Sequence, residues 1–198
     1  MNWPAESPLR VRVAGISAIE VNISCPNVSS GGIEFGTDSK IAARVTSAVK
    51  AASSLPVIIK LSPNVTDIVE MATIVADAGA DAVTLINTLR GMMIDVGETR
   101  PSLGNMIGGL SGPAIKPVAL YMVYKVTGAV RVPVIGCGGI GSAEDALEFI
   151  MAGASAVQVG TASLSNPRVA LDVLDGIVDY VERKKIKSLK EIVGIAMT

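Results

Sequence analysis

Short apolar runs alternate with amphipathic stretches along most of the chain. In residues 38–53, Ile41, Val45 and Val49 recur at a spacing of four and predict a helix, with Thr37 or Asp38 as its N-cap. The short runs are almost wholly apolar, as expected for parallel strands that are covered on both faces. The alternation predicts an α/β fold with right-handed crossovers. We expect strands near 18–24, 57–61, 82–86, 134–136 and 156–159, and helices over 38–53, 66–78, 113–127, 142–152, 166–184 and 188–196, with Thr66 and Ser142 as further caps.

Two repeated motifs mark the strand–helix units. The pattern Ala-Gly-x-x-Ala-[Val/Ile] begins at Ala14, Ala78 and Ala152, and in each copy the glycine is placed to end a helix in a left-handed cap before a strand. The pattern Pro-Val-Ile begins at Pro56 and Pro133 and opens the intervening strands. One connection, residues 87–110, is too long for a simple turn. It resembles a hairpin of 92–96 with 102–106, and long loops inside compact domains are usually functional.

The number of units leaves two architectures open. About five strand–helix units are visible, whereas a closed (β/α)₈ barrel needs eight strands and typically about 250 residues. The chain is therefore either an open sheet or the C-terminal part of a barrel that lacks its first three units.

Composition and charge exclude several classes of function. With 198 residues, 49% of them hydrophobic, the chain can bury a substantial core and is expected to form one domain. The formal charge of -1, without a basic run, argues against binding to nucleic acid or to a membrane surface. No apolar run is long enough to cross a bilayer, and residues 1–13 lack the apolar core of a secretory signal. Two cysteines do not make a disulfide framework, so a cytoplasmic location is the simplest interpretation.

Polar side chains at the predicted strand ends are the candidate chemistry. The chain has no histidine, so a general base must be a cysteine, carboxylate, lysine or tyrosine. Cys25 follows the first strand, between Asn22 and Asn27. A free cysteine is often just a small buried hydrophobe, but active sites of such folds lie at this end of the strands. Cys137 lies at another strand end, and we expect its side chain only to pack against its neighbours.

Lys60 and the pair Asn87–Thr88 end the next two strands. A lysine inside an apolar strand is costly unless its ammonium meets an anion or an electron-rich acceptor, although it can also reach solvent. Asparagine offers a donor and an acceptor to an amide-bearing ring, or it opens an Asx turn. Glycine turns at 108–112, 138–139 and 160 suit a phosphate at the last two strands, although each glycine alone is weak evidence. We predict no metal site.

Several motifs together resemble the dihydroorotate dehydrogenase family, specifically the class 1B catalytic subunits. The resemblance runs from about Ala14 to the C-terminus. The cysteine is typical of class 1, and the GGxxFGTD loop is typical of subclass B. The motifs are EVNISCPNV at 20–28, GGxxFGTD at 31–38, KLSPNVTDI at 60–68, INT at 86–88, GGLSGPAIKP at 108–117 and AGASAV at 152–157.

The resemblance implies a (β/α)₈ TIM barrel that holds FMN across the carboxyl ends of its strands, with dihydroorotate as substrate and orotate as product. Cys25 would act as general base on C5 of dihydroorotate while hydride passes from C6 to the flavin, and Lys60 would lie against the N1/O2 edge of the flavin. The other implied contacts are Asn22 to both FMN and substrate, Asn27, Asn87 and Thr88 to the substrate, Ile86 through its backbone to the flavin, and Gly112, Gly138, Gly139, Gly160 and Thr161 to the FMN phosphate and ribityl chain.

The resemblance also implies partners and a departure from the family. Electrons would leave through a second subunit that carries FAD and an iron–sulfur cluster and reach NAD, in an assembly built on a homodimer or a heterotetramer. Residues 1–13 are atypical, residues 14–198 would be the C-terminal part of the barrel, and the three N-terminal units are absent. We therefore expect this chain alone to be weakly active or inactive, with an exposed sheet edge prone to association. Two rivals stay open: a non-catalytic flavin-binding fragment, and another phosphate-binding barrel enzyme that uses Cys25 and Lys60 without flavin.

Overall fold

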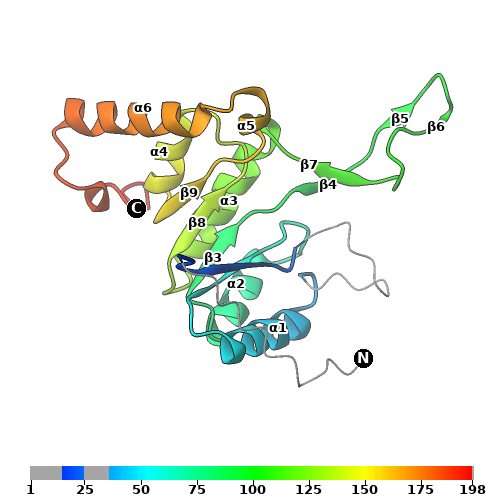
Figure 1. Cartoon of the computed structure of the whole chain (residues 1–198), viewed down its shortest axis with the longest axis horizontal. Helices are drawn as coiled ribbons and strands as arrows, with labels where there is room; N and C mark the ends of the chain where they lie inside the picture. The colour runs from blue at the N-terminus through cyan, green and yellow to red at the C-terminus, as the bar shows by residue number, and fades with distance from the viewer. Residues whose placement is uncertain (1–14, 25–35, 198) are drawn as a thin grey trace.

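A five-stranded parallel sheet organises the molecule (Figure 1). The computed structural model describes residues 15–24 and 36–197. The strands lie in the order in which they occur along the chain, so every crossover adds the next strand on the same side. This is the arrangement of a barrel wall rather than of a doubly wound sheet, whose strand order reverses. The strands are β1 (Ile19–Asn22), β2 (Val57–Lys60), β3 (Ala82–Leu85), β8 (Val134–Cys137) and β9 (Ala156–Gln158).

Helices cover one face of this sheet, and neighbouring helices pack against one another (Figure 1). The 3₁₀ helix η1 leads directly into α3, and α6 packs against α4. The helices are α1 (Ser39–Ala52), α2 (Ile68–Asp77), η1 (Pro113–Ile115), α3 (Lys116–Thr127), α4 (Ala143–Met151), α5 (Ala162–Ser165), α6 (Val169–Lys184) and η2 (Leu189–Glu191). No helix of the described residues is both long and apolar enough to cross a membrane.

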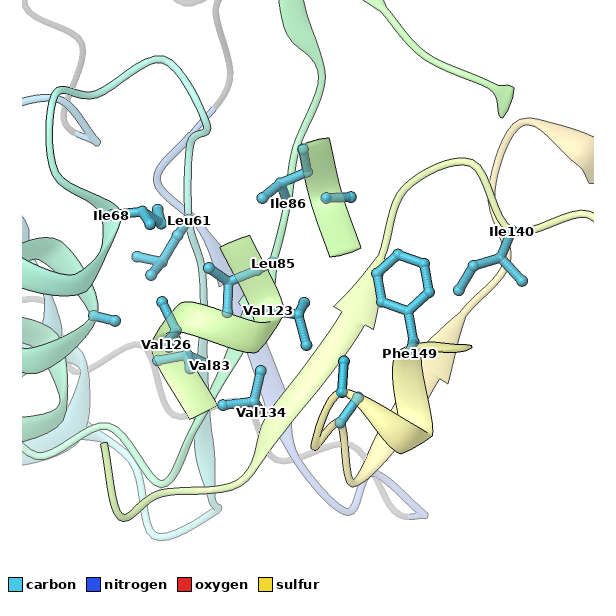
Figure 2. Packing of buried hydrophobic residues seen from close by; sticks show 14 of the residues in the cluster. Leu61, Ile68, Val83, Leu85, Ile86, Val123, Val126, Val134, Ile140 and Phe149 are labelled. Carbon is cyan, nitrogen blue, oxygen red and sulfur yellow. The ribbon is translucent and has the colours of Figure 1, made fainter. Parts of the chain in front are cut away.

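The hydrophobic core lies between the sheet and these helices (Figure 2). Alternate strand residues such as Val83 and Leu85 are completely buried there. Phe149 of α4 is also completely buried, and its ring lies on the backbone of Gly136 in β8. A Cβ on Gly136 would come within 2.6 Å of the ring. The close approach of helix and strand at this point therefore requires glycine.

Most of the predicted helix boundaries are confirmed, and one cap is wrong. Asp38 caps α1 by accepting from the Ile41 amide at 3.0 Å, and Ser142 forms a capping box with Asp145. The predicted cap Thr66 is wrong, because the carboxylate of Asp67 accepts two amides of α2. The helix-ending glycines of the repeat behave as expected, with φ of +103° at Gly79 and +104° at Gly153.

The last predicted helices are shorter than expected. The stretch 166–184 begins as a helix only at Val169, because Asn166 precedes Pro167 and is extended. The closing helix predicted over 188–196 is wrong: only Leu189–Glu191 form a 3₁₀ turn there, and Gly194 has a φ of +76°.

The long connection forms an arm that projects away from the sheet (Figure 1). At its base β4 (Leu89–Gly91) pairs with β7 (Gly108–Leu110), and nearer the tip β5 (Ile94–Asp95) pairs with β6 (Arg100–Pro101). The predicted hairpin is confirmed, but its predicted pairing of 92–96 with 102–106 is only partly right. The Ser102 amide donates to the Met93 carbonyl at 2.9 Å, whereas the strands themselves pair Ile94–Asp95 with Arg100–Pro101. The Asp95 carboxylate accepts from the Glu98 amide at 3.0 Å, which closes the turn early and brings Arg100 into the ribbon.

Candidate functional site

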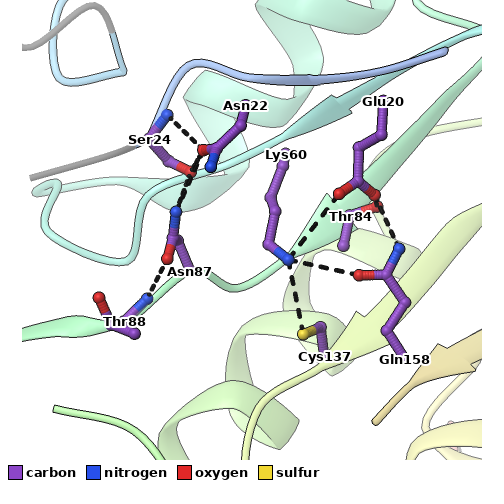
Figure 3. A network of polar contacts seen from close by, with 9 residues as sticks. All are labelled: Glu20, Asn22, Ser24, Lys60, Thr84, Asn87, Thr88, Cys137 and Gln158. Carbon is purple, nitrogen blue, oxygen red and sulfur yellow. Dashed lines mark hydrogen bonds and ion pairs between the residues drawn. The ribbon is translucent and has the colours of Figure 1, made fainter. Parts of the chain in front are cut away.

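Polar side chains occupy the face of the sheet that the helices leave free. Asn22 is paired in register with Lys60, Lys60 with Thr84, and Cys137 with Gln158. Side chains alternate between the two faces of a strand, so these residues lie on the face opposite the core positions of the same strands. They form two neighbouring groups, one around Asn22 and one around Lys60 (Figure 3).

The first group joins the ends of β1 and β3 through carboxamides. The Asn22 Oδ1 accepts from the Ser24 hydroxyl at 2.8 Å, from the Ser24 amide at 3.2 Å and from the Asn87 Nδ2 at 3.1 Å. Asn87 also donates to the Ser24 hydroxyl at 2.9 Å. The structure thus brings together two residues predicted to contact substrate, and their network fixes which atom of Asn22 accepts.

Thr88 is held beside this group by its neighbours. Its amide donates to the Asn87 Oδ1 at 2.8 Å, and its carbonyl accepts from the Asn64 Nδ2 at 3.1 Å. Asn64 also accepts from the Arg90 amide at 2.9 Å, so one side chain anchors the start of the arm. The Thr88 side chain packs directly against Gly109 of β7.

The second group surrounds the ammonium of Lys60. Its Nζ lies 3.3 Å from the Gln158 Oε1, 3.8 Å from the Glu20 Oε1 and 3.8 Å from the Cys137 Sγ. The Glu20 Oε2 accepts from the Thr84 hydroxyl at 2.6 Å and from the Gln158 Nε2 at 2.7 Å. All five strands of the sheet therefore contribute one residue each to a partly buried network that includes an opposite pair of charges (Figure 3).

Cys137 is a neutral neighbour of this ammonium. Burial raises the pKa of the Cys137 thiol and outweighs the nearby positive charge of Lys60, which lowers it. The prediction that Cys137 serves packing accounts for its burial, but its contact with Lys60 went unforeseen.

Ile86 and Gly138 lie between the polar face and the core. Ile86 is almost completely buried, and its amide donates to the Cys137 carbonyl at 2.7 Å. The predicted backbone contact to a flavin would therefore use the carbonyl of Ile86. Gly138 has a φ of +134°, and a Cβ there would lie 2.8 Å from Ala119 and 3.5 Å from Ile86.

The remaining predicted glycines form a cradle of three adjacent turns. Gly112 and Gly139 have φ of +85° and +77°, and a Cβ on Gly139 would lie 2.9 Å from the Gly112 carbonyl oxygen. A Cβ on Gly112 would lie 3.8 Å from the Thr161 side chain, whereas the space beside Gly160 is open. Within the described chain no group accepts from the amides of Gly139, Gly160 or Thr161. Unpaired amides on adjacent glycine turns suit a phosphate group.

Ion pairs of Lys116 lie next to this cradle and hold the loop after β8. Asp145 accepts from the Gly141 amide at 2.9 Å, the Ser142 amide at 3.0 Å and the Lys116 Nζ at 2.7 Å. Burial alone would raise the pKa of Asp145, but the hydrogen bonds from Lys116 and Gly141 outweigh it and lower the pKa. Hydrogen bonds to Asp145 and Glu148 raise the pKa of Lys116, so both partners stay charged at neutral pH.

Cys25 and Asn27 lie outside the described residues. The residues on either side of that gap are in contact: a Cβ on Gly36 would lie 2.7 Å from the Ile23 carbonyl oxygen and 3.2 Å from the Ser24 Cα. Gly36 therefore lies against the carboxyl end of β1.

Sequence reasoning assigned no role to several residues of these networks. They carry no single strong signal, but all except Thr84 and Gln158 belong to the motifs that carry the family resemblance. The residues are Glu20, Ser24, Asn64, Thr84 and Gln158. Among the described residues, no group of three or more histidine, cysteine or acidic side chains is placed to hold a metal ion.

Comparisons with known proteins show which family the chain belongs to. A family model described as dihydroorotate dehydrogenase matches residues 11–181. A "Dihydroorotate dehydrogenase B (NAD(+)), catalytic subunit" from Alkaliphilus oremlandii (strain OhILAs) is 56% identical over 181 residues, 91% of this chain and 60% of the relative. A protein of the same name from Trichlorobacter lovleyi is 59% identical over 179 residues, 90% of this chain and 59% of the relative. The chain thus spans about 60% of the length of the curated relatives that it matches.

A solved structure shows the same fold. The crystal structure of DHODH in complex with ferulenol from Eimeria tenella superposes with a TM-score of 0.75 at 22% identity, over 91% of this chain and 54% of that chain. At this identity the likeness concerns the fold alone. It confirms the predicted class, a TIM-barrel-type α/β fold of which about five parallel strand–helix units are present here.

Proposed function

Because the chain belongs to the dihydroorotate dehydrogenase family, we propose that it carries the flavin and substrate contacts for the FMN-dependent oxidation of dihydroorotate to orotate in de novo pyrimidine biosynthesis. One observation supports this most: Asn22 and Lys60 end two neighbouring strands, Asn87 follows the third, and all three lie at the end where TIM-barrel active sites lie.

The carboxamides suit a pyrimidine-like ring. Asn22 and Asn87 present donors and acceptors in an orientation that Ser24 fixes, and Thr88 is held at their side. A ring with alternating amide N–H and C=O groups needs such pairs, because each polar group that it buries must find a partner. We assign Asn22, Asn27, Asn87 and Thr88 to substrate.

The glycine turns suit the phosphate and ribityl chain of FMN. Gly112, Gly138, Gly139, Gly160 and Thr161 would hold that end, while Asn22, Lys60 and the backbone of Ile86 would hold the ring system. When bound, FMN supplies the hydride acceptor of the reaction. The Lys60 ammonium is partly buried, so its charge acts on an adjacent electron-rich ring with little screening.

Cys25 would remove a proton from C5 of dihydroorotate. A thiol has an ordinary pKa of about 8.5, so the loop after β1 has to favour the thiolate when substrate is present. With no histidine in the chain, no imidazole competes for this role.

We also propose a partner for electron transfer. The curated relatives are named as catalytic subunits of an NAD(+)-type enzyme. A separate subunit with FAD and an iron–sulfur cluster would carry the electrons to NAD, in an assembly built on a homodimer or heterotetramer of this chain. The cytoplasmic location stays a prediction.

The test is a single turnover without oxygen. The chain is mixed with FMN, desalted and given dihydroorotate, and the orotate formed per bound FMN is measured for the wild type and for Cys25→Ala. We expect the wild type to form orotate slowly. The rate of orotate formation in the variant should be lower by a factor of at least about one hundred. Equal rates would remove Cys25 as the base. Bound FMN without any orotate would reduce the proposal to flavin binding.

A further inference from the structure

Lys60 is held differently from the other described lysines that form ion pairs. Its Nζ lies 3.8 Å from the Glu20 carboxylate, which is too long for a hydrogen bond. The other ammonium–carboxylate contacts are short: 2.6 Å in Lys50–Asp81, 2.7 Å in Lys116–Asp145 and 3.0 Å in Lys116–Glu148. Lys60 and Glu20 thus form an open ion pair.

Gln158 keeps this ion pair open. Its carbonyl accepts from Lys60 at 3.3 Å, and its amino group donates to Glu20 at 2.7 Å. The orientation of the amide is therefore fixed, because only its oxygen can face the ammonium and only its nitrogen can face the carboxylate. Thr84, which is completely buried, donates to the same carboxylate oxygen at 2.6 Å and holds it in place.

The arrangement leaves the ammonium incompletely satisfied in a partly buried place. The Lys60 side chain is 18% exposed and that of Glu20 is 28% exposed, so their charges are screened less than at the surface. An ammonium has three donors, and here its contacts are one amide oxygen at moderate distance, one neutral thiol and one distant carboxylate.

This inference rests on the FMN site proposed above. We propose that Glu20 and Gln158 are positioning residues that set how strongly Lys60 acts on the flavin. The Glu20 carboxylate offsets part of the positive charge that would stabilise the reduced, electron-rich ring. Gln158 prevents Lys60 from closing onto Glu20, so the ammonium stays available to the cofactor.

The two residues therefore have opposite effects on the flavin. In Glu20→Gln the offsetting charge is gone while the shape is kept, so the equilibrium moves toward reduced flavin. In Gln158→Leu the bridge is gone while both charges remain, so Lys60 pairs with Glu20 and the equilibrium moves toward oxidised flavin. If the substitutions only loosened the site, the midpoint potentials of both variants would move in the same direction, toward that of free FMN.

The test measures the midpoint potential of bound FMN by titration against reference dyes at neutral pH. We expect a shift of about tenfold in the two-electron equilibrium for each variant, which is about 30 mV upward for Glu20→Gln and about 30 mV downward for Gln158→Leu. Asp81→Asn removes the carboxylate of a tight lysine pair away from the site, and should leave the potential unchanged.

The outcomes separate this inference from the proposed function. A wild-type chain that retains no FMN after desalting would refute the function itself. Retained FMN with unchanged potentials in both variants, or with shifts of the same sign, would overturn the roles of Glu20 and Gln158. If one variant fails to retain FMN, the direction of the potential shift in the other variant decides whether the proposed roles hold.

Discussion

Replacing Gly139 with alanine should damage the cradle and the fold together. The residue has a φ of +77°, and the added Cβ would lie 2.8 Å from the Lys116 Cβ and 2.9 Å from both the Lys116 amide nitrogen and the Gly112 carbonyl oxygen. A left-handed backbone costs a residue other than glycine about 1–3 kcal/mol. Because two of the close atoms belong to the backbone, the turns must also move apart, which adds about 1 kcal/mol or more.

A total of about 3 kcal/mol corresponds to a fall in Tm of roughly 6–12 °C for a chain of this size. The free energy of unfolding is measured in urea and Tm by circular dichroism. FMN affinity, measured by quenching of flavin fluorescence, should fall at least about tenfold, which is about 1.4 kcal/mol, because the turns that carry the unpaired amides are displaced.

Gly141→Ala is the matched control in the same loop. Its Cβ would lie 3.8 Å from Ala162 and 3.9 Å from the Asp145 carboxylate, which are ordinary contacts, and its φ is outside the left-handed region. Its stability should change by no more than about 0.5 kcal/mol. Equal losses in the two variants would refute the reasoning, because they would show that neither the positive φ nor the close approach of the turns matters.

Three further predictions test the core, an ion pair and a partly buried thiol. Phe149→Ala empties a completely buried position and should cost about 3–5 kcal/mol in urea unfolding; a loss below about 1 kcal/mol would contradict the packing described. The hydrogen bond from Lys50 lowers the pKa of Asp81, so the pair stabilises the fold above about pH 4, and this contribution is lost as the pH falls through the lowered pKa. Asp81→Asn should therefore weaken the loss of stability at acid pH. An unchanged acid dependence of the free energy of unfolding would show that another group causes it. Burial raises the pKa of Cys137, so in a Cys25→Ser background a thiol reagent should label Cys137 at least about tenfold more slowly in the native chain than in urea, and equal rates would contradict its burial.

The fold was largely predictable because its signals are local. Apolar runs such as Val57–Lys60 and Val134–Cys137 mark the buried strands, and the helix-ending glycines Gly79 and Gly153 punctuate the units. Local signals fail where two neighbours offer the same chemistry, as Thr66 and Asp67 do at the start of α2. They fail also at the C-terminus, where a helical pattern is not realised beyond a single 3₁₀ turn.

The candidate site was predictable only in part. Strand ends pointed to Asn22, Lys60 and Asn87, because polar residues after apolar runs are visible in the sequence. The bonds between Glu20 and Gln158 and between Glu20 and Thr84 span 138 and 64 residues. They depend on the strand register and on the face that each side chain occupies, neither of which any local pattern reports.

The most direct test of the account is the visible spectrum of the purified chain after incubation with FMN and desalting, recorded before and after anaerobic addition of dihydroorotate. We expect equimolar FMN to be retained and its absorption band to bleach with substrate. A colourless chain after desalting would contradict the central claim, because the glycine cradle and the polar face around Lys60 would then not form a flavin site.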